Sequence, residues 1–211
     1  MVCELRRRKR PHVLADVVAD VLRWWAMKHR VCPWWLGYWL LNPFRKLGQN
    51  PREILAPYVR EGMTVLEPGP GMGFFTLELA RLVGASGKVV AVDVQPKMIA
   101  KLKQRLAKAG VDGRVDARLA TTDSMGLAAL QGAVDLTVAF YVVHEFPDSG
   151  RFFTEVAQAS KPGARVLVAE PKGHVRAKAF EAELEAATKA GFTVQEQPQV
   201  RRSLAALLRK S

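Results

Sequence analysis

A short apolar run followed by three alternating glycines constrains the fold of this chain more than any other feature. The run 64–66 leads into Glu67, and glycines follow at positions 69, 71 and 73 before apolar residues recur at helical spacing. Glycine is needed where the backbone takes a positive φ or approaches another group closely. The pattern predicts a strand, a tight turn and a helix, with ligand contacts at the carboxyl end of the strand.

A second acid lies where a bound nucleoside needs it. The apolar run 87–92 is predicted to be the next strand, and it ends in Asp93, twenty residues after Gly73. An acid at this point accepts hydrogen bonds from both hydroxyls of a ribose. The turn reads E-x-G-x-G-x-G, unlike the G-x-G-x-x-G of dinucleotide sites, and Glu67 would repel a pyrophosphate. A cationic nucleoside without a phosphate is therefore the favoured ligand.

The segment 65–76 resembles motif I of the class I S-adenosylmethionine-dependent methyltransferases, and the chain is similar to their small type 11 members related to quinone-biosynthesis enzymes. The cofactor of that family carries a sulfonium and an ammonium, which suits the carboxylate of Glu67. The resemblance implies an S-adenosyl-L-methionine site made of Glu67, Gly69, Gly71, Gly73, Asp93, Met98 and Asp123. Met98 would pack on the adenine, and Asp123 would accept a hydrogen bond from its amino group. The alternative for Asp123 is the N-cap of a helix. The alternative for the glycine motif is an ordinary turn, with Asp93 as a surface residue.

Strand and helix patterns alternate from residue 51 onward, which is typical of an α/β fold. Strands are predicted at 64–66, 87–92, 115–120, 134–141, 164–169, 192–196 and 203–208, and helices at 51–58, 75–83, 96–109, 152–157 and 177–190. The stretch 161–163, Lys-Pro-Gly, is predicted to end a helix before the fifth strand. The resemblance implies a Rossmann-like, doubly wound, seven-stranded sheet that is mostly parallel and closes with a C-terminal antiparallel hairpin.

Residues 1–50 are predicted to be an N-terminal helical extension of a methyltransferase domain at 51–211. All five tryptophans lie between positions 24 and 39, and residues 1–60 hold 12 Lys/Arg against 4 Asp/Glu. In the resembled family, such an extension covers the acceptor pocket as a lid. Contact with a membrane interface is the alternative, because basic, tryptophan-rich segments bind anionic headgroups. The longest uncharged run has 14 residues, fewer than the about 20 of a membrane span.

The cysteine content favours a cytoplasmic protein, with peripheral membrane contact left open by the extension. Cys3 and Cys32 are the only cysteines, so neither a disulfide framework nor a zinc site is expected, and no metal is predicted. Arsenite methylation, another activity on the resembled fold, uses several cysteine thiolates. Two cysteines do not favour that activity.

The loop after the fourth predicted strand holds the candidate catalytic residues Tyr141, His144 and Glu145. In the resembled family this loop faces the methyl acceptor. His144 is the only histidine with an adjacent carboxylate, so it is a candidate base with Glu145 as its orienting partner. The alternative is an ordinary polar loop that caps the next helix. Methyl transfer depends mainly on holding the reactants in line, so a base is needed only for a protonated acceptor.

We expect methyl transfer to a small, lipophilic or thiol acceptor by in-line displacement. RNA methylation is the first alternative, because the chain has a formal net charge of +12. The sequence contains no Asn-Pro-Pro-Tyr-type signature and no RNA-binding module, so a nucleic-acid partner is not favoured. The second alternative is a membrane-associated module that binds the cofactor without turnover. The sequence does not determine the oligomeric state.

Overall fold

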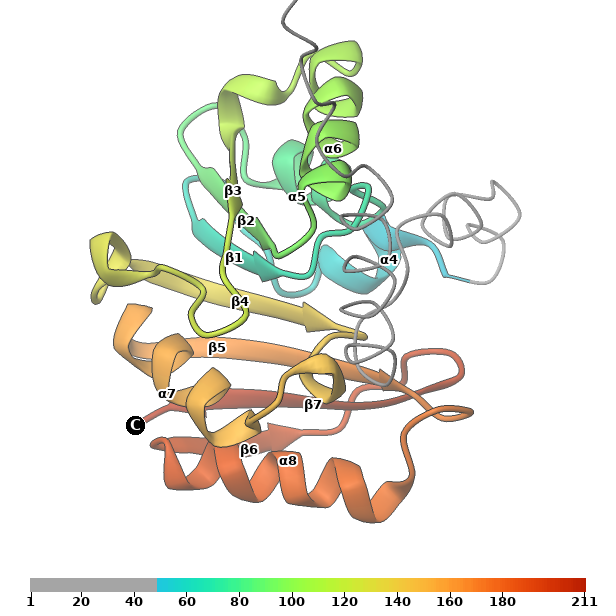
Figure 1. The fold of residues 1–211 in the computed structure, drawn as a ribbon, viewed down its shortest axis with the longest axis vertical. Coiled ribbons are helices and arrows are strands. Elements are labelled where there is room, and N and C mark those ends of the chain that lie inside the picture. Colours follow the sequence, from blue (N-terminus) through green and yellow to red (C-terminus); the bar gives the residue numbers. More distant parts are fainter. Residues whose placement is uncertain (1–48) are drawn as a thin grey trace, which may run out of the picture. The chain divides into compact units, whose positions relative to one another are not determined.

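One twisted sheet of seven strands runs through residues 49–211, the part of the chain that the computed structural model describes. The strands are β1 (Thr64–Pro68), β2 (Lys88–Asp93), β3 (Val115–Leu119), β4 (Val134–Phe140), β5 (Ser160–Pro171), β6 (Phe192–Glu196) and β7 (Ser203–Lys210). Their order in the sheet is β3-β2-β1-β4-β5-β7-β6. The first five strands pair in parallel, and β7 runs antiparallel to both of its neighbours. Figure 1 shows this arrangement, which confirms the predicted Rossmann-like α/β sheet.

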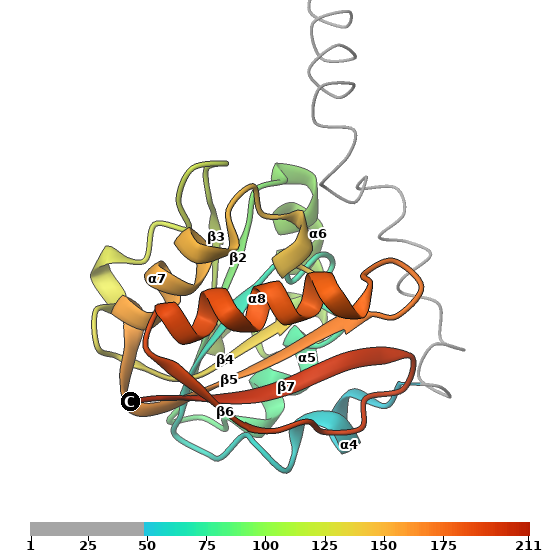
Figure 2. The same ribbon diagram turned by 90° about the horizontal axis from the view of Figure 1, so that it is seen from below.

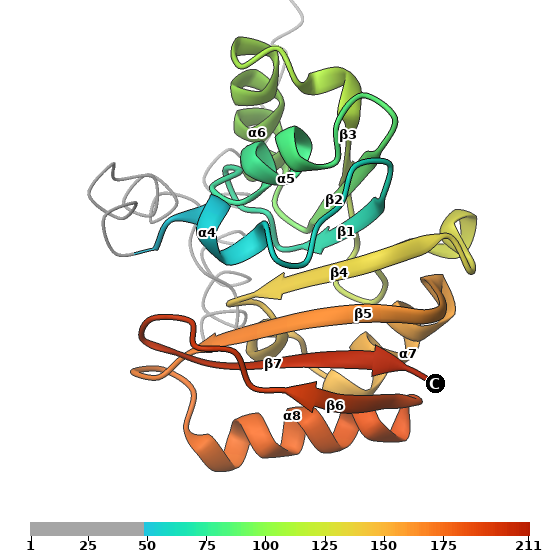
Figure 3. The same ribbon diagram turned by 180° about the vertical axis from the view of Figure 1, so that it is seen from behind.

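The helices form two layers, one on each face of the sheet. They are α4 (Pro51–Leu55), α5 (Thr76–Leu82), α6 (Pro96–Lys108), α7 (Ser149–Ala159) and α8 (Ala177–Lys189). One core joins α7 and α8 to the sheet, and a second core joins α4, α5 and α6 to the opposite face. Figure 2 shows α8 and α4 on opposite sides of the strands, and Figure 3 shows the α4–α6 layer from behind.

The strand sequences explain why both faces are covered. Residues along a strand point alternately to the two faces, and both sets in the central strands are apolar. In β5, Val166 and Val168 belong to the α7–α8 core, whereas Leu167 and Ala169 belong to the α4–α6 core. All four side chains are fully buried. Such continuous apolar runs are characteristic of parallel strands between two helical layers.

Several predicted boundaries differ from the structure. Helix α4 ends at Leu55, before the predicted end at 58. Strand β4 ends at Phe140 and not at Tyr141, because Tyr141 takes a left-handed φ of 62°. Strand β5 begins at Ser160 and includes the Lys-Pro-Gly stretch that was predicted to precede it. The register of β4 against β5 shifts between Val134 and Leu136, an irregularity of the kind that lets a strand contain Pro and Gly.

The predicted N-terminal extension, apart from its last two residues, lies outside the described residues. The lid and membrane-interface hypotheses for residues 1–50 therefore stay predictions. Within residues 49–211, no helix is long and apolar enough to cross a membrane.

The two-layer core predicts very different costs for two leucine truncations. Leu79 is fully buried in the α4–α6 core, whereas Leu119 at the end of β3 is 56% exposed. Leu79→Ala should lower the free energy of unfolding by about 2–5 kcal/mol, because it removes buried methyl groups and leaves a cavity. The matched control Leu119→Ala should change it by less than about 0.5 kcal/mol. Urea unfolding of the full chain measures both; similar values would contradict the assigned core.

Candidate functional site

The direction in which the chain adds strands reverses between β1 and β4. From β1 the chain continues to β2 and β3 on one side, and β4 and β5 follow on the other. The loops that leave neighbouring strands diverge at such a point and open a crevice at the carboxyl ends, where ligands bind in open α/β sheets. In Figure 1 the carboxyl ends of β1, β4 and β5 lie at the same edge of the sheet.

The glycine turn follows β1 at this edge and has a packed side and an open side. A Cβ atom on Gly69 would lie 2.5 Å from Val142 Cγ2, and one on Gly73 would lie 2.5 Å from Leu102 Cδ1. Gly71, with a φ of 54°, has no heavy atom within 4 Å of such a position. Gly69 and Gly73 therefore let the turn pack against Val142 and Leu102, whereas the space beside Gly71 is open to a ligand.

Asp93, at the end of β2, ties the glycine turn to the next helix. Its Oδ2 accepts a hydrogen bond from the backbone N–H of Gly71 at 3.2 Å, and its Oδ1 accepts one from that of Gln95 at 2.8 Å. Burial raises the pKa of Asp93, and these backbone N–H groups counteract the rise. Each carboxylate oxygen has a further lone pair. The aspartate is thus held rigidly and retains the capacity to accept two ligand hydroxyls.

Glu67 is a buried carboxyl at the end of β1. Only 4% of the residue is exposed, and its Oε2 has no hydrogen-bond partner in the described part of the chain. Burial raises the pKa of Glu67 to about 8; the nearby Thr76 hydroxyl lowers it, and the charge of Asp93 raises it. The Thr76 Oγ1 is itself without a hydrogen bond in residues 49–211, so it only partly compensates Glu67. An unpaired buried acid is costly, and a cationic ligand would relieve that cost.

His144 is oriented by a carboxylate that the sequence analysis did not assign. Its Nδ1 lies 2.6 Å from Glu170 Oε2. Oε1 of Glu170 accepts the backbone N–H groups of Val143 at 2.8 Å and of His144 at 3.4 Å. Glu170, at the carboxyl end of β5, makes the contact at Nδ1. An orienting role of Glu145 stays a prediction. The charge of Glu145 raises the pKa of His144.

Tyr141 is hydrogen-bonded to the start of β7. Its hydroxyl is hydrogen-bonded to Ser203 Oγ at 3.0 Å and to the side chain of Gln49. Its ring packs against the α4–α6 core, whereas Val143, beside Glu170, belongs to the α7–α8 core. Tyr141 thus joins the end of β4 to the start of β7, and its place with His144 in a catalytic group stays a prediction.

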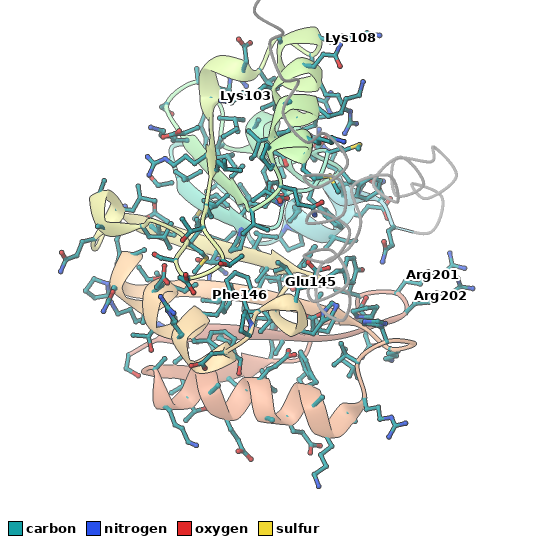
Figure 4. The ribbon with its side chains drawn as sticks, viewed as in Figure 1. Lys103, Lys108, Glu145, Phe146, Arg201 and Arg202 are labelled. Carbon is teal, nitrogen blue, oxygen red and sulfur yellow. The ribbon has the colours of Figure 1, made fainter. Side chains whose placement is uncertain are left out.

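Asp123 and Met98 occupy different environments. Met98 is 3% exposed in the first turn of α6. Asp123 is exposed and lines a small pocket with Phe146 and Pro147. No helix begins at Asp123, so the N-cap alternative is wrong; Ser124 donates its backbone N–H to Thr121 Oγ1 instead. Figure 4 labels Glu145 and Phe146 on the turn after β4, and Arg201 and Arg202 in the loop before β7.

A family profile described as "Methyltransferase domain" matches residues 59–205. The chain belongs to this methyltransferase family. A solved S-adenosylmethionine-dependent methyltransferase from Aquifex aeolicus superimposes with a TM-score of 0.75 at 25% identity, covering 85% of this chain and 98% of that one. These findings confirm the predicted class I S-adenosylmethionine-dependent methyltransferase family and its cofactor.

Two curated relatives of this chain are longer than it is. The ubiquinone/menaquinone biosynthesis C-methyltransferase of Escherichia coli is 28% identical over 156 residues, which cover 74% of this chain and 59% of the relative. An arsenite methyltransferase of Halobacterium salinarum is 31% identical over 121 residues, which cover 57% of this chain and 30% of the relative. The chain thus matches between about a third and three fifths of the length of these proteins.

The methyltransferase has functional candidates that sequence reasoning did not assign. Glu170 follows the apolar run 164–169, as Glu67 follows its own apolar run. An acid at the end of a predicted buried strand was therefore the signal that could have identified Glu170. Glu183 lies three residues after Phe180 and four before Ala187, on the buried face of α8, and is 7% exposed. An acid at helical spacing from apolar residues was the signal that could have identified it.

The raised pKa of Glu67 predicts how its amide variant affects the stability of the ligand-free protein. An unfolded glutamate has a pKa of 4.5, against about 8 in the fold, so stability is lost as the pH rises from 4.5 to 8. Glu67→Gln should remove this loss and raise the free energy of unfolding at pH 7.5 by roughly 1–4 kcal/mol, with little gain at pH 4.5. Urea unfolding across this range measures the difference.

Glu185→Gln provides the control, because Glu185 is exposed on α8. It should give the same small change at every pH. A Glu67→Gln protein that is less stable than the parent at pH 7.5 would mean that Glu67 is ionised and well paired in the fold.

Proposed function

We propose that this protein transfers a methyl group from S-adenosylmethionine to a small, lipophilic or thiol acceptor by in-line displacement. The observation that carries the proposal is the meeting of Glu67, the open side of Gly71 and Asp93 at one edge of the sheet. Asp93 accepts the Gly71 N–H at 3.2 Å, so the two are fixed relative to one another. Glu67 supplies a buried, unpartnered oxygen for a cation.

The residues of the site fit the chemical groups of the cofactor. Asp93 would accept the two ribose hydroxyls, the turn at Gly69, Gly71 and Gly73 would let the ligand approach the backbone, and Glu67 would face positive charge. Met98 and Asp123 remain the candidates for the adenine. When bound, S-adenosylmethionine supplies the methyl group, whose carbon bonds to the acceptor while the electron pair of the broken bond stays on sulfur. The protein contributes mainly by aligning the groups and excluding water.

His144 is the proposed base for an acceptor that must lose a proton. Because Nδ1 lies 2.6 Å from a carboxylate oxygen, it carries the hydrogen, and Nε2 keeps its lone pair for the acceptor. Burial lowers the pKa of His144. The hydrogen bond and charge of Glu170, together with the charges of Glu145 and Glu183, raise it by more than burial lowers it, so the net shift of the pKa is upward. A phenol or a thiol fits this base, as in other His–carboxylate pairs.

The acceptor class is supported by composition and by the relatives. A C-methyltransferase of quinone biosynthesis is among the relatives, and the tryptophan-rich segment 24–39 suits a lipophilic acceptor or peripheral membrane contact. Another relative is named an arsenite methyltransferase. Both cysteines of this chain precede residue 49, so the methyltransferase domain itself offers no thiolate to arsenic. We therefore propose phenols and thiols as acceptors in preference to arsenite.

Calorimetry with S-adenosylhomocysteine tests the cofactor site. Asp93→Ala should weaken binding roughly 10- to 100-fold, because a hydrogen bond to a charged group contributes about 1.5–3 kcal/mol. Asp93→Asn keeps the shape and should be intermediate. Asp116→Ala is the control, because Asp116 on β3 is paired with Lys88 and Arg118, and it should bind as the parent does. Binding of NADH without binding of S-adenosylhomocysteine would overturn the assignment.

A radiolabelled-methyl screen with small metabolites, lipids and RNA as separate fractions tests the acceptor. We expect label in the small-molecule or lipid fraction. With a phenol or thiol acceptor, His144→Ala should lower turnover about 100-fold or more at pH 7 and recover at high pH, where the acceptor ionises unaided. His174→Ala is the control, because this ring contacts His144 but is exposed. Label confined to the RNA fraction would overturn the small-molecule acceptor and favour RNA methylation.

A further inference from the structure

A third acid, Glu183, interacts electrostatically with the His144–Glu170 pair, and its own purpose has not been explained by the proposed function. Glu183 projects from α8, and the residue is 7% exposed. Its Oε2 has no hydrogen-bond partner in residues 49–211. The charges that act on it come from Glu170 on β5 and from His144 on the turn after β4. A buried carboxyl without a partner is costly, so its position beside a histidine–carboxylate pair calls for an explanation.

The hydrogen bonds distinguish the two acids. Glu170 is fully buried and accepts from three donors, which are two backbone N–H groups and the imidazole Nδ1. Acceptance from three donors is the behaviour of an ionised carboxylate. Glu183 has no comparable set of donors, and two neighbouring buried carboxylates resist being charged together. Burial, followed by the charge of Glu170, accordingly raises the pKa of Glu183 to about 8, while His144 lowers it.

We propose that Glu183 is a positioning residue of the His144–Glu170 pair that controls when the imidazole of His144 carries a proton. This inference rests on the proposed function, in which a proton leaves the acceptor heteroatom for Nε2 of His144 and is later lost to water. While Glu183 is neutral, a single negative charge, that of Glu170, lies beside the imidazole. Once Glu183 ionises, a second negative charge favours the imidazolium and delays its loss of the proton.

The other groups around His144 do not replace Glu183 in this role. Glu145 lies on the same turn and is half-buried, so its charge is better screened by solvent. His174, from the loop after β5, is exposed, and its ring meets that of His144 edge-on at 5.0 Å between centroids. Glu183 is the acid in this part of the structure that combines near-complete burial with an unpartnered oxygen.

NMR titration of the His144 imidazole in the full, ligand-free chain tests the proposal without requiring turnover. The signal is identified by its absence in His144→Gln. In the parent protein the titration should extend over two steps, because His144 and Glu183 interact. In Glu183→Gln it should become one step with a midpoint lower by about 0.5 pH unit or more. Glu181→Gln, an exposed acid two residues away on α8, should match the parent.

Two further measurements separate this role from a merely structural one. Glu183→Met removes the same acid without adding a polar group, so it serves if the amide variant does not fold. In a methylation assay, the acid limb of the pH–rate profile should move to lower pH by the same amount, with the plateau kcat and KM unchanged. A purely structural Glu183 would change the melting temperature and leave the histidine titration as it was.

The possible outcomes distinguish this inference from the proposed function. Superimposed titration curves for the parent and Glu183→Gln, or a one-step curve in the parent itself, would overturn the role of Glu183 even in an active methyltransferase. A shifted curve in a protein that methylates none of the fractions would instead overturn the proposed function and leave the coupling of the two residues standing.

Discussion

The burial of acids at the carboxyl ends of strands is the constraint on which the rest of this structure depends. The central strands lie between two helical layers, so side chains at the strand ends are also shielded from water. Asp93 is the last residue of β2, and Glu67 and Glu170 are the last but one of β1 and β5; none of the three is more than 8% exposed. A buried carboxyl is stable only where donors or cations compensate it. The three acids differ in how far the fold supplies that compensation.

That difference separates the proposed roles of the acids. Glu170 is fully compensated by protein donors, so it acts as a fixed support for His144. Asp93 is held by two backbone N–H groups and keeps lone pairs for a ligand. Glu67 has an oxygen without any partner in the described residues. The unpartnered Glu67 carboxyl thus lowers the stability of the ligand-free protein, and a bound cation would restore that stability. Such a trade-off is common at binding sites.

The order of the elements could be predicted because it depends on local patterns. Apolar runs, prolines at helix starts and glycines after helices follow from the chain itself, and all seven predicted strands occur in the structure. The boundaries were less predictable. Tyr141 leaves β4 through a left-handed φ, with its hydroxyl bonded to Ser203 and Gln49. Strand β5 includes a Lys-Pro-Gly stretch at a register shift against β4. Both depend on residues far away in the chain.

The sequence by itself determined the strand, glycine turn and helix, the acids Glu67 and Asp93 that follow the first two apolar runs, and hence the methyltransferase family with its cofactor. These features are local, since they need only the spacing of glycines and acids along one βα unit. Only the tertiary structure decided the partner of His144. Glu145 is adjacent in the chain, but the 3₁₀ turn at Val143–Glu145 directs the imidazole to Glu170, 26 residues away. The parallel pairing of β4 with β5 brings their carboxyl ends together, and no local pattern encodes that contact.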